Sequence, residues 1–189
     1  MTEFTDHKIS LVFEGDTEET ILRMAKEGYP NKTGGILVGR YTADNSCACV
    51  TEILPPSPDS KIGPAEFHRG VEGVQEALHE RWDAPERTYY LGEWHSHPNI
   101  FGPQEELNIE PGALDIQTMV ELADDPKTAC PQPMLVIVGI LDHNDIMLQA
   151  QAGDFPVDLF EGEGRLSHNH QAGDILQFLL ENMVGPDHG

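Results

Sequence analysis

The chain has 189 residues, of which 33 are acidic and 11 are basic, so its formal net charge at pH 7 is −22. This charge argues against binding to nucleic-acid phosphates or to anionic membranes, because both carry the same sign. It is compatible with a basic protein partner, or with an acidic surface that only keeps the chain soluble. A chain of this length is expected to form a single domain over residues 1–189, with a core large enough to need no disulfide.

The cysteine content and the N-terminus predict a cytoplasmic protein. The three cysteines are odd in number, and Cys47 and Cys49 lie two positions apart on a predicted strand, where a disulfide is disfavoured. The first residues are charged and lack the apolar core of a secretory signal. No run approaches the ~20 apolar residues that a membrane span requires.

The first third of the chain predicts a strand, a helix and two more strands. Residues 7–14 alternate apolar and polar side chains, as a half-buried strand does. Residues 16–28 begin with an Asp-Thr N-cap and carry a helical apolar stripe. The Gly-led segment 34–41 and residues 48–54 then predict two neighbouring strands of one meander.

The middle of the chain predicts a loop, a helix, a strand and another helix. Residues 55–64 are rich in Pro, Ser and Asp and predict a loop, and residues 71–82 repeat apolar side chains at helical spacing. A strand is expected over 87–95, ended by Pro98. A further helix is expected to open after residue 112, with Asp115 in its first turn. Its inward-facing side chains are expected to be Leu114, Met119, Val120 and Leu122.

The last third predicts a hairpin and a final helix. Residues 134–141 form a continuous apolar run that is typical of a central strand, and residues 146–150 are expected to pair with it and close the sheet. Residues 162–169 predict a loop, and residues 171–184 predict an amphipathic helix. The order of elements indicates the α/β class, with the core at about 8–151 and the helix at about 171–184.

Three side chains form a candidate zinc site. His95 and His97 stand at i and i+2 of the predicted strand, so both project from one face while Ser96 projects from the other. Asp115 follows at the start of the next helix. Two imidazoles and one carboxylate are typical of catalytic zinc sites, which leave a fourth position open. The alternative is a surface strand with two solvated histidines.

These residues belong to a set of motifs that resembles the JAMM (MPN+) metalloprotease family. The pieces are Thr33-Gly34-Gly35, then His-Ser-His-Pro at 95–98, then Pro111 to Asp115, in the family's order over roughly residues 8–151. The resemblance implies a mixed, mostly antiparallel sheet flanked by helices, the cytidine-deaminase-like JAB/MPN sandwich. It also implies a zinc ion held by His95, His97 and Asp115.

The resemblance implies a function as well. Family members cleave isopeptide bonds to ubiquitin or ubiquitin-like modifiers, and zinc would activate water and polarise the scissile carbonyl. The segment Phe67-x-Arg69 and the wording Gly-Glu-Trp-His-Ser-His-Pro are similar to the prokaryotic branch encoded beside E1-like and E2-like genes, including antiphage operons. The implied partners are a ubiquitin-like protein, its conjugates and such operon partners.

Two positions depart from the family pattern. Lys32 stands where the family has the general-base Glu, and loss of a general base typically lowers the rate by ~10²–10⁴-fold. A lysine ammonium near a zinc dication is expected to swing outward or lose its proton. Gly112 stands where the family has an oxyanion-binding Ser, a loss typically worth ~10²–10³-fold that a backbone N–H at the helix start could partly replace.

Other carboxylates and histidines carry weaker hypotheses. Glu93 shares the face of the two histidines, and it either stands in as a base or orients a ligand from behind. The long loop before Asp115 is either a substrate flap that supplies an acid or a solvated insertion. The candidate acids of that loop are Glu105, Glu106 and Glu110. His168 and His170 repeat the i, i+2 spacing but are interpreted as part of a solvated loop in preference to a second metal site, and His68 and His79 are interpreted as ordinary surface or helix residues.

Two functions remain after this comparison. The first is a zinc isopeptidase or peptidase that holds the tail of a ubiquitin-like protein as an added strand. The second is a pseudoenzyme that binds the modifier or a partner without cutting it, because of Lys32. Zinc deaminases are disfavoured because Cys130 stands alone without a Pro-Cys-x-x-Cys pair. Thermolysin-type peptidases are disfavoured because His-Glu-x-x-His is absent from the sequence.

Overall fold

The computed structural model describes residues 10–43, 45–99, 111–124, 130, 132–140, 146–152, 155–161 and 165–166. Three helices are interspersed among the strands of the described residues. Their bounds are β1 Ser10–Phe13, α1 Thr17–Gly28, β2 Gly34–Tyr41, β3 Cys47–Leu54, β4 Lys61–Ile62, β5 Phe67–His68, α2 Val74–Trp82, β6 Tyr89–Pro98, α3 Ala113–Asp124, β7 Met134–Ile140, β8 Ile146–Ala152, β9 Phe155–Glu161 and β10 Arg165–Leu166.

The large sheet is mixed and curls back on itself. Its strand order is β1-β3-β2-β6-β7-β8-β9-β10, and β9 also pairs with β1. The β1–β3, β1–β9 and β6–β7 pairs are parallel, whereas β3–β2, β2–β6, β7–β8, β8–β9 and β9–β10 are antiparallel. The predicted α/β class with a mixed, mostly antiparallel sheet is therefore confirmed.

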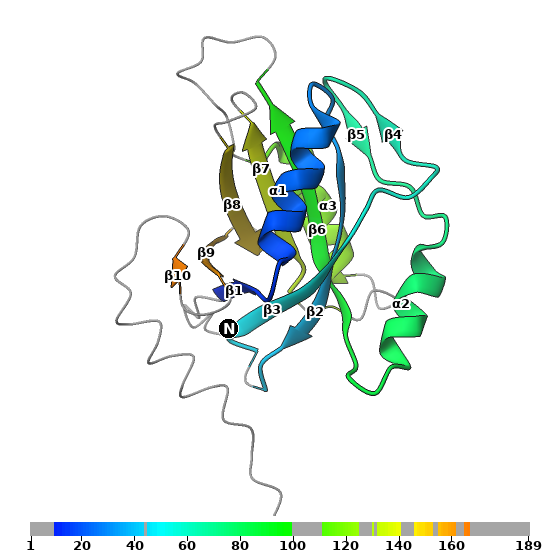
Figure 1. Cartoon of the computed structure of the whole chain (residues 1–189), viewed down its shortest axis with the longest axis vertical. Coiled ribbons are helices and arrows are strands. Elements are labelled where there is room, and N and C mark those ends of the chain that lie inside the picture. The colour runs from blue at the N-terminus through cyan, green and yellow to red at the C-terminus, as the bar shows by residue number, and fades with distance from the viewer. Residues whose placement is uncertain are drawn as a thin grey trace, which may run out of the picture.

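Helices cover both faces of this sheet. Figure 1 shows α1 lying across one face, with α3 behind the sheet and α2 beside it. Ile21 and Ala25 of α1 pack on one core cluster with Leu37 and Trp94, while Met119 of α3 packs on the other face. The alternation along β7 explains this division, because Leu135 and Ile137 join Met119 while their neighbours in β7 join the α1 cluster. No helix among the described residues is long and apolar enough to cross a membrane.

A bulge in β6 sets which side chains face the α3 side. The register with β2 shifts between Leu37 and Val38, next to Gly92 of β6. Gly92 has a φ of 152°, and a Cβ there would lie 1.9 Å from the carbonyl oxygen of Met134, so only glycine fits. Beyond the bulge, Trp94 and Ser96 are fully buried, whereas Glu93, His95 and His97 are half-buried. The predicted face-sharing of the two histidines is confirmed.

Four details of the sequence prediction are wrong within the described residues. Residues 61–62 were expected in a loop, but they form β4, which pairs with β5 as a separate two-stranded sheet. A strand of two residues has no periodicity to detect. Val71 precedes α2 and is 69% exposed, and Val120 of α3 is 48% exposed rather than facing inward. The sheet also continues past the β7–β8 hairpin into β9 and β10.

Several other predictions lie outside the described residues or are confirmed. The strand at 134–141 is confirmed as β7, which lies between β6 and β8, and the helix after residue 112 is confirmed as α3. Asp16 is the N-cap of α1 but makes no side-chain cap hydrogen bond. The predicted helix at 171–184, the acids Glu105, Glu106 and Glu110, and the histidines His168 and His170 fall outside the described part of the chain.

Candidate metal site

Three side chains of types that can bind a metal converge from the end of β6 and the start of α3. The ligand atoms of His95, His97 and Asp115 all lie within 4.8 Å of one another. His95 Nε2 is 3.0 Å from His97 Nε2 and 3.8 Å from Asp115 Oδ2. The two imidazole rings lie nearly parallel, with ring centroids 4.8 Å apart. The structure thus brings together the three residues that the sequence nominated.

The donor set suits a divalent cation such as zinc. Two nitrogens bound to one tetrahedral zinc at ~2.0–2.1 Å would lie about 3.3 Å apart, close to the distance between His95 Nε2 and His97 Nε2. The carboxylate of Asp115 adds a hard, charged oxygen ligand on the third side. A site with two imidazoles and one carboxylate leaves an open position for a further ligand.

The protonation state of His95 also suits metal binding. Burial lowers the pKa of His95 to about 4, against the opposing attraction of the Asp115 carboxylate. The neighbouring His97 and Lys32 lower the pKa further. His95 is therefore neutral near pH 7, with a nitrogen lone pair available for a cation.

Backbone contacts between β6 and the segment before β2 hold the histidine strand in place. The Thr33 N–H donates to Ser96 Oγ at 2.9 Å, and the Ser96 N–H donates to the Thr33 carbonyl at 2.7 Å. Both residues are buried. Ser96, on the core face, therefore connects Lys32 and Thr33 to the strand that carries both imidazoles.

Gly34 creates the space beside His95. A Cβ at Gly34 would lie 2.4 Å from the Trp94 carbonyl oxygen, 2.5 Å from Phe67 Cε1 and 3.0 Å from His95 Cβ. Any larger residue would push Phe67 away from His95. The first glycine of the Gly-Gly motif is thus explained by the close approach of three other segments.

The start of α3 fixes the carboxylate ligand. The Gly112 N–H donates to Asp115 Oδ2 at 2.8 Å, in the arrangement by which a residue in the first turn caps its own helix. Gly112 is exposed, and a Cβ there would lie 3.4 Å from Asp115 Oδ2. The N–H of Gly112 is therefore already used by Asp115, although the sequence analysis offered helix-start N–H groups as oxyanion donors.

Lys32 lies near enough to influence the histidines. Its backbone N–H donates to the Gly63 carbonyl at 2.8 Å, which joins the β2 entry to the β4–β5 hairpin. The side chain is half-buried, and its charge is one of the causes of the lowered pKa of His95. A positive group thus occupies the surroundings in which the family has a carboxylate.

Glu93 is engaged by an arginine from the hairpin. Arg69 Nε donates to Glu93 Oε1 at 2.6 Å, and Tyr90 Oη donates to the same oxygen at 3.4 Å. The β6 bulge places Tyr90 and Glu93 on one face although they are three positions apart. Burial raises the pKa of Glu93, and the Arg69 charge opposes this effect. These contacts favour the interpretation of Glu93 as a supporting residue behind the ligands.

A cavity of about 410 Å³ opens beside the three ligands. One part of its wall is apolar, and the other part is polar and charged. It is lined by Phe67, His68, Arg69, Glu93, His95, Asp115, Thr118, Met119 and Leu135. The cavity therefore joins the candidate metal site to the Arg69–Glu93 pair.

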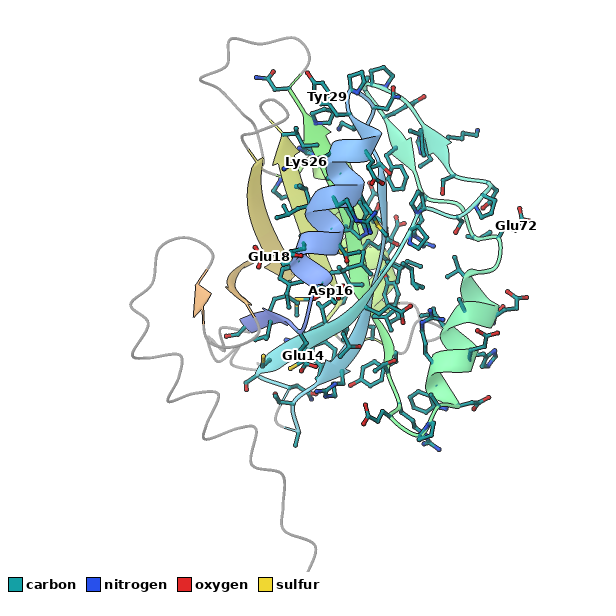
Figure 2. All side chains as sticks on the ribbon, viewed as in Figure 1. Glu14, Asp16, Glu18, Lys26, Tyr29 and Glu72 are labelled. Carbon is teal, nitrogen blue, oxygen red and sulfur yellow. The ribbon has the colours of Figure 1, made fainter. Side chains whose placement is uncertain are left out.

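The segment that carries Arg69 is held by its own hydrogen bonds. Asp59 accepts the N–H groups of Val71 and Glu72 at 3.1 and 3.0 Å, and Ser60 Oγ accepts the Gly70 N–H at 2.9 Å. The two backbone contacts lower the pKa of Asp59. Figure 2 shows Glu72 at the end of this hairpin, next to α2. The sequence pointed to Arg69 only through the family resemblance, and its position in the cavity wall was not predicted.

Two of the histidines that the sequence analysis interpreted as surface residues, His68 and His79, are described and lie on the surface. His79 is exposed on α2, and His68 is exposed on β5 at the rim of the cavity, with Nε2 3.3 Å from Glu66 Oε2. Among the described residues, His95, His97 and Asp115 form the cluster able to hold a metal.

The curled mixed sheet, the helix on each face and the His-His-Asp cluster define a JAB-type fold with a candidate metal site. The family model for prokaryotic homologs of the JAB domain matches residues 15–149. The chain belongs to this family.

Two named relatives are similar to this chain in sequence, and one solved structure is similar to it in fold. A CD-NTase/cGAS isopeptidase from Enterobacter hormaechei subsp. hoffmannii (strain UCI 50) is 33% identical over 155 residues, covering 80% of this chain and 81% of the relative. The probable metalloprotease y4qB from Sinorhizobium fredii (strain NBRC 101917 / NGR234) is 23% identical over 121 residues, covering 64% and 70%. The solution structure of protein DSY2949 from Desulfitobacterium hafniense has a TM-score of 0.53 at 21% identity, covering 85% of this chain and 99% of that one.

Proposed function

We propose that the protein is a zinc-dependent isopeptidase or peptidase that removes or matures a ubiquitin-like modifier in a bacterial conjugation pathway. The observation that carries the proposal is the convergence of His95, His97 and Asp115 within 4.8 Å beside a cavity of about 410 Å³. The relative named as an isopeptidase and the relative named as a probable metalloprotease support the same reaction class.

In this proposal the metal is held by the donor set, and the other residues of the cavity do the rest of the work. Zinc bound by His95, His97 and Asp115 would supply Lewis-acid polarisation of the scissile carbonyl and an activated water. Phe67, Met119 and Leu135 provide the apolar part of the cavity wall, which excludes bulk water from one side of the substrate. Glu93, held by Arg69, supports the strand that carries the histidines.

Among the described residues, the proposed site lacks an evident group to accept the proton of the attacking water. A general base near the metal typically contributes ~10²–10⁴-fold, and the family position for it holds Lys32. Glu93 is not free to replace it fully, because Arg69 and Tyr90 both donate to its Oε1. We therefore expect slow turnover by the chain as it stands.

A second candidate function rests on the same observation at position 32. The positive charge of Lys32 acts on His95, so it would repel a dication bound there, whereas it would attract a developing anion. A protein with this fold and weak turnover would bind the modifier or an E1-like or E2-like partner without cutting it. The pseudoenzyme and the isopeptidase would use the same binding surface and would differ only in the rate of cleavage.

We extend the proposal to the pathway and the compartment. The proposed ligands are the tail of a ubiquitin-like protein and its conjugates. The proposed partners are E1-like and E2-like proteins. The proposed setting is antiphage defence. The relative's name, CD-NTase/cGAS isopeptidase, supports this setting. The three cysteines are free thiols, which supports a reducing cytoplasm.

Cleavage by matched charge variants tests both candidates. Three zinc-loaded proteins are compared: the unchanged chain, Lys32→Glu and Lys26→Glu. Each is incubated with a panel of ubiquitin-like proteins fused at the C-terminus to a reporter, and release of the reporter is followed by gel electrophoresis. Lys26 is exposed on α1, as Figure 2 shows, so this control makes the same charge change away from the cavity.

We expect Lys32→Glu to cut at least about a hundredfold faster than Lys26→Glu. Slow but measurable cleavage by the unchanged chain supports the enzyme, and cleavage only after Lys32→Glu supports the pseudoenzyme. No cleavage by any zinc-loaded variant would contradict the hydrolase proposal.

A further inference from the structure

Arg69 brings a permanent positive charge into the wall of the cavity. Its side chain is 23% exposed, and Glu93, its partner, is 14% exposed. Among the side chains that line the cavity, Arg69 is the one that is always protonated. The proposed reaction as described above uses it only to support Glu93.

Most of the hydrogen-bonding capacity of Arg69 is unused. A guanidinium carries five N–H groups, and the described residues accept only two: Nε donates to Glu93 Oε1, and Nη1 donates to the Gly70 carbonyl at 3.2 Å. Both N–H groups of Nη2 lack an acceptor among the described residues. Donors that are partly withdrawn from water gain most when a ligand supplies acceptors.

The guanidinium is held in place before any ligand arrives. Glu93 fixes Nε, while the hydrogen bonds of Asp59 and Ser60 to residues 70–72 fix the backbone that follows Arg69. A donor that is already ordered loses less entropy on binding, so its hydrogen bond contributes more to affinity. Arg69 is therefore suited to direct a ligand and not merely to neutralise Glu93.

The charges around Arg69 select a neutral acceptor. Glu93 already offsets the positive charge, and Asp115 adds a second carboxylate to the cavity wall. An anionic side chain would meet both carboxylates, while a peptide carbonyl would accept from Nη2 without that repulsion. The chemistry thus fits the main chain of a peptide.

The spacing along β6 indicates which carbonyl of the peptide is bound. Glu93 and His95 are two positions apart on one face of a strand, a separation of ~6.6–7 Å at ~3.3 Å per residue. In an extended peptide, carbonyls that point to the same side recur at this same spacing. For a peptide that runs parallel to β6 with its scissile carbonyl at the His95 site, the carbonyl two residues earlier lies at the Arg69–Glu93 pair.

We propose that Arg69 is a specificity-determining residue: its free Nη2 edge donates to the main-chain carbonyl two residues before the scissile one, in an extended acyl chain. This inference rests on the proposed function, because it places the scissile carbonyl at the His95, His97 and Asp115 site. It explains how a short hairpin outside the large sheet contributes to substrate choice. It selects for an extended backbone, so a folded or helical acyl segment is rejected.

Binding of matched backbone probes tests the inference. The probe is fluorescein-Ala-Ala-Ala-Gly-Gly amide, whose last glycine stands for the residue that supplies the scissile carbonyl. In a second probe an alkene replaces the peptide bond that follows the third alanine, which removes the carbonyl assigned to Arg69. In a control probe the alkene replaces the preceding peptide bond. Affinity for the zinc-loaded full chain is measured by fluorescence anisotropy.

The unchanged chain is expected to bind the all-amide probe about tenfold to a hundredfold more tightly than the second probe. The control probe should lose much less, because the missing carbonyl points to the other side. Arg69→Gln should bind the all-amide and second probes equally. Arg81→Gln should keep the preference, since Arg81 is also 23% exposed and paired with Glu52, but does not line the cavity.

If Arg69→Gln shows no melting transition and so does not fold, Arg69→Lys is tested in its place. Arg69→Lys keeps a cation beside Glu93 but lacks the planar fork, so its preference for the all-amide probe over the second probe should be at least tenfold smaller. A preference that survives in the Arg69 variant would overturn the inference, as would no binding of the all-amide probe by the unchanged chain. Cleavage is scored separately. An Arg69-dependent preference without cleavage by any variant would sink the proposed function while keeping the binding role of Arg69.

Discussion

The two faces of β6 differ in character: alternate residues of this one strand form a packed core face and a polar face. On the face toward α1, Trp94 and Ser96 are fully buried. On the face toward α3, Glu93, His95 and His97 remain half-buried, and Glu93 and His95 line the cavity. Packing therefore determines the first face, while the second keeps polar groups that the rest of the fold does not need.

This difference separates stability from chemistry within a few ångströms. A residue on the core face has many apolar neighbours, so its truncation is felt by the whole molecule. On the cavity face, His95 has few apolar neighbours. The close contacts of its Nε2 atom are with His97 and Asp115. The comparison predicts that variants on the two faces fail in different assays.

The largest expected effect is on the core face. Trp94→Ala should lower the free energy of unfolding by about 3–5 kcal/mol, because a buried tryptophan leaves a large cavity. His97→Asn on the opposite face should change it by less than about 1 kcal/mol when metal is absent. Urea unfolding of the chelator-treated proteins measures both. Equal losses in the two variants would break the comparison.

The next effect concerns the polar residue on the core face. Ser96→Ala should lower the free energy of unfolding by about 1–3 kcal/mol, because it leaves the buried Thr33 N–H without its acceptor. Ser57→Ala is the control, since Ser57 is half-buried and its hydroxyl makes no hydrogen bond among the described residues. A loss no greater than that of the control would mean that the Thr33 contact does not stabilise the fold.

A smaller effect is expected on the cavity face, where the site departs from its family. In the Lys32→Glu background, Gly112→Ser should raise cleavage by about tenfold, which is less than the ~10²–10³-fold of a preorganised oxyanion donor because position 112 is exposed. The new side chain fits, since its Cβ would lie 3.4 Å from Asp115 Oδ2. Ala113→Ser moves the hydroxyl by one position. The same gain from Ala113→Ser would show that the position of the hydroxyl is irrelevant.

The last prediction is a pH dependence that belongs to the cavity face. Burial holds the pKa of His95 at about 4, below its ordinary value near 6.5, so the unfolded chain takes up a proton first. The stability of the metal-free protein should therefore be fully present above about pH 6.5 and should fall as the pH is lowered toward 4. His95→Gln should flatten this slope in urea unfolding at pH 7, 6 and 5. An unchanged slope would assign it to other groups.

The two faces also differ in how far the sequence predicts them. The alternation of β6 and the apolar run of β7 reveal the strands, and the i, i+2 histidines with Asp115 reveal the ligand set. The Arg69–Glu93 contact joins residues 24 positions apart through a hairpin whose strands have two residues each. No periodic pattern marks such a contact, because it depends on Asp59 and Ser60 folding the segment back.

Errors in the prediction have the same physical origin. Val120 fits a helical apolar stripe, yet it is 48% exposed because α3 covers the sheet with Met119 and Leu122 instead. The pairing of β9 with β1 depends on curling of the whole sheet, which no local pattern encodes. The single domain over residues 1–189 stays a prediction.

A zinc-edge anomalous difference map of the protein crystallised with zinc tests the central claim most directly. The account predicts one strong peak within about 2.0–2.2 Å of His95 Nε2, His97 Nε2 and an Asp115 carboxylate oxygen, and its loss in His97→Asn. Zinc bound elsewhere, or a peak at this place that persists in His97→Asn, would contradict the assignment of these three residues as the metal site.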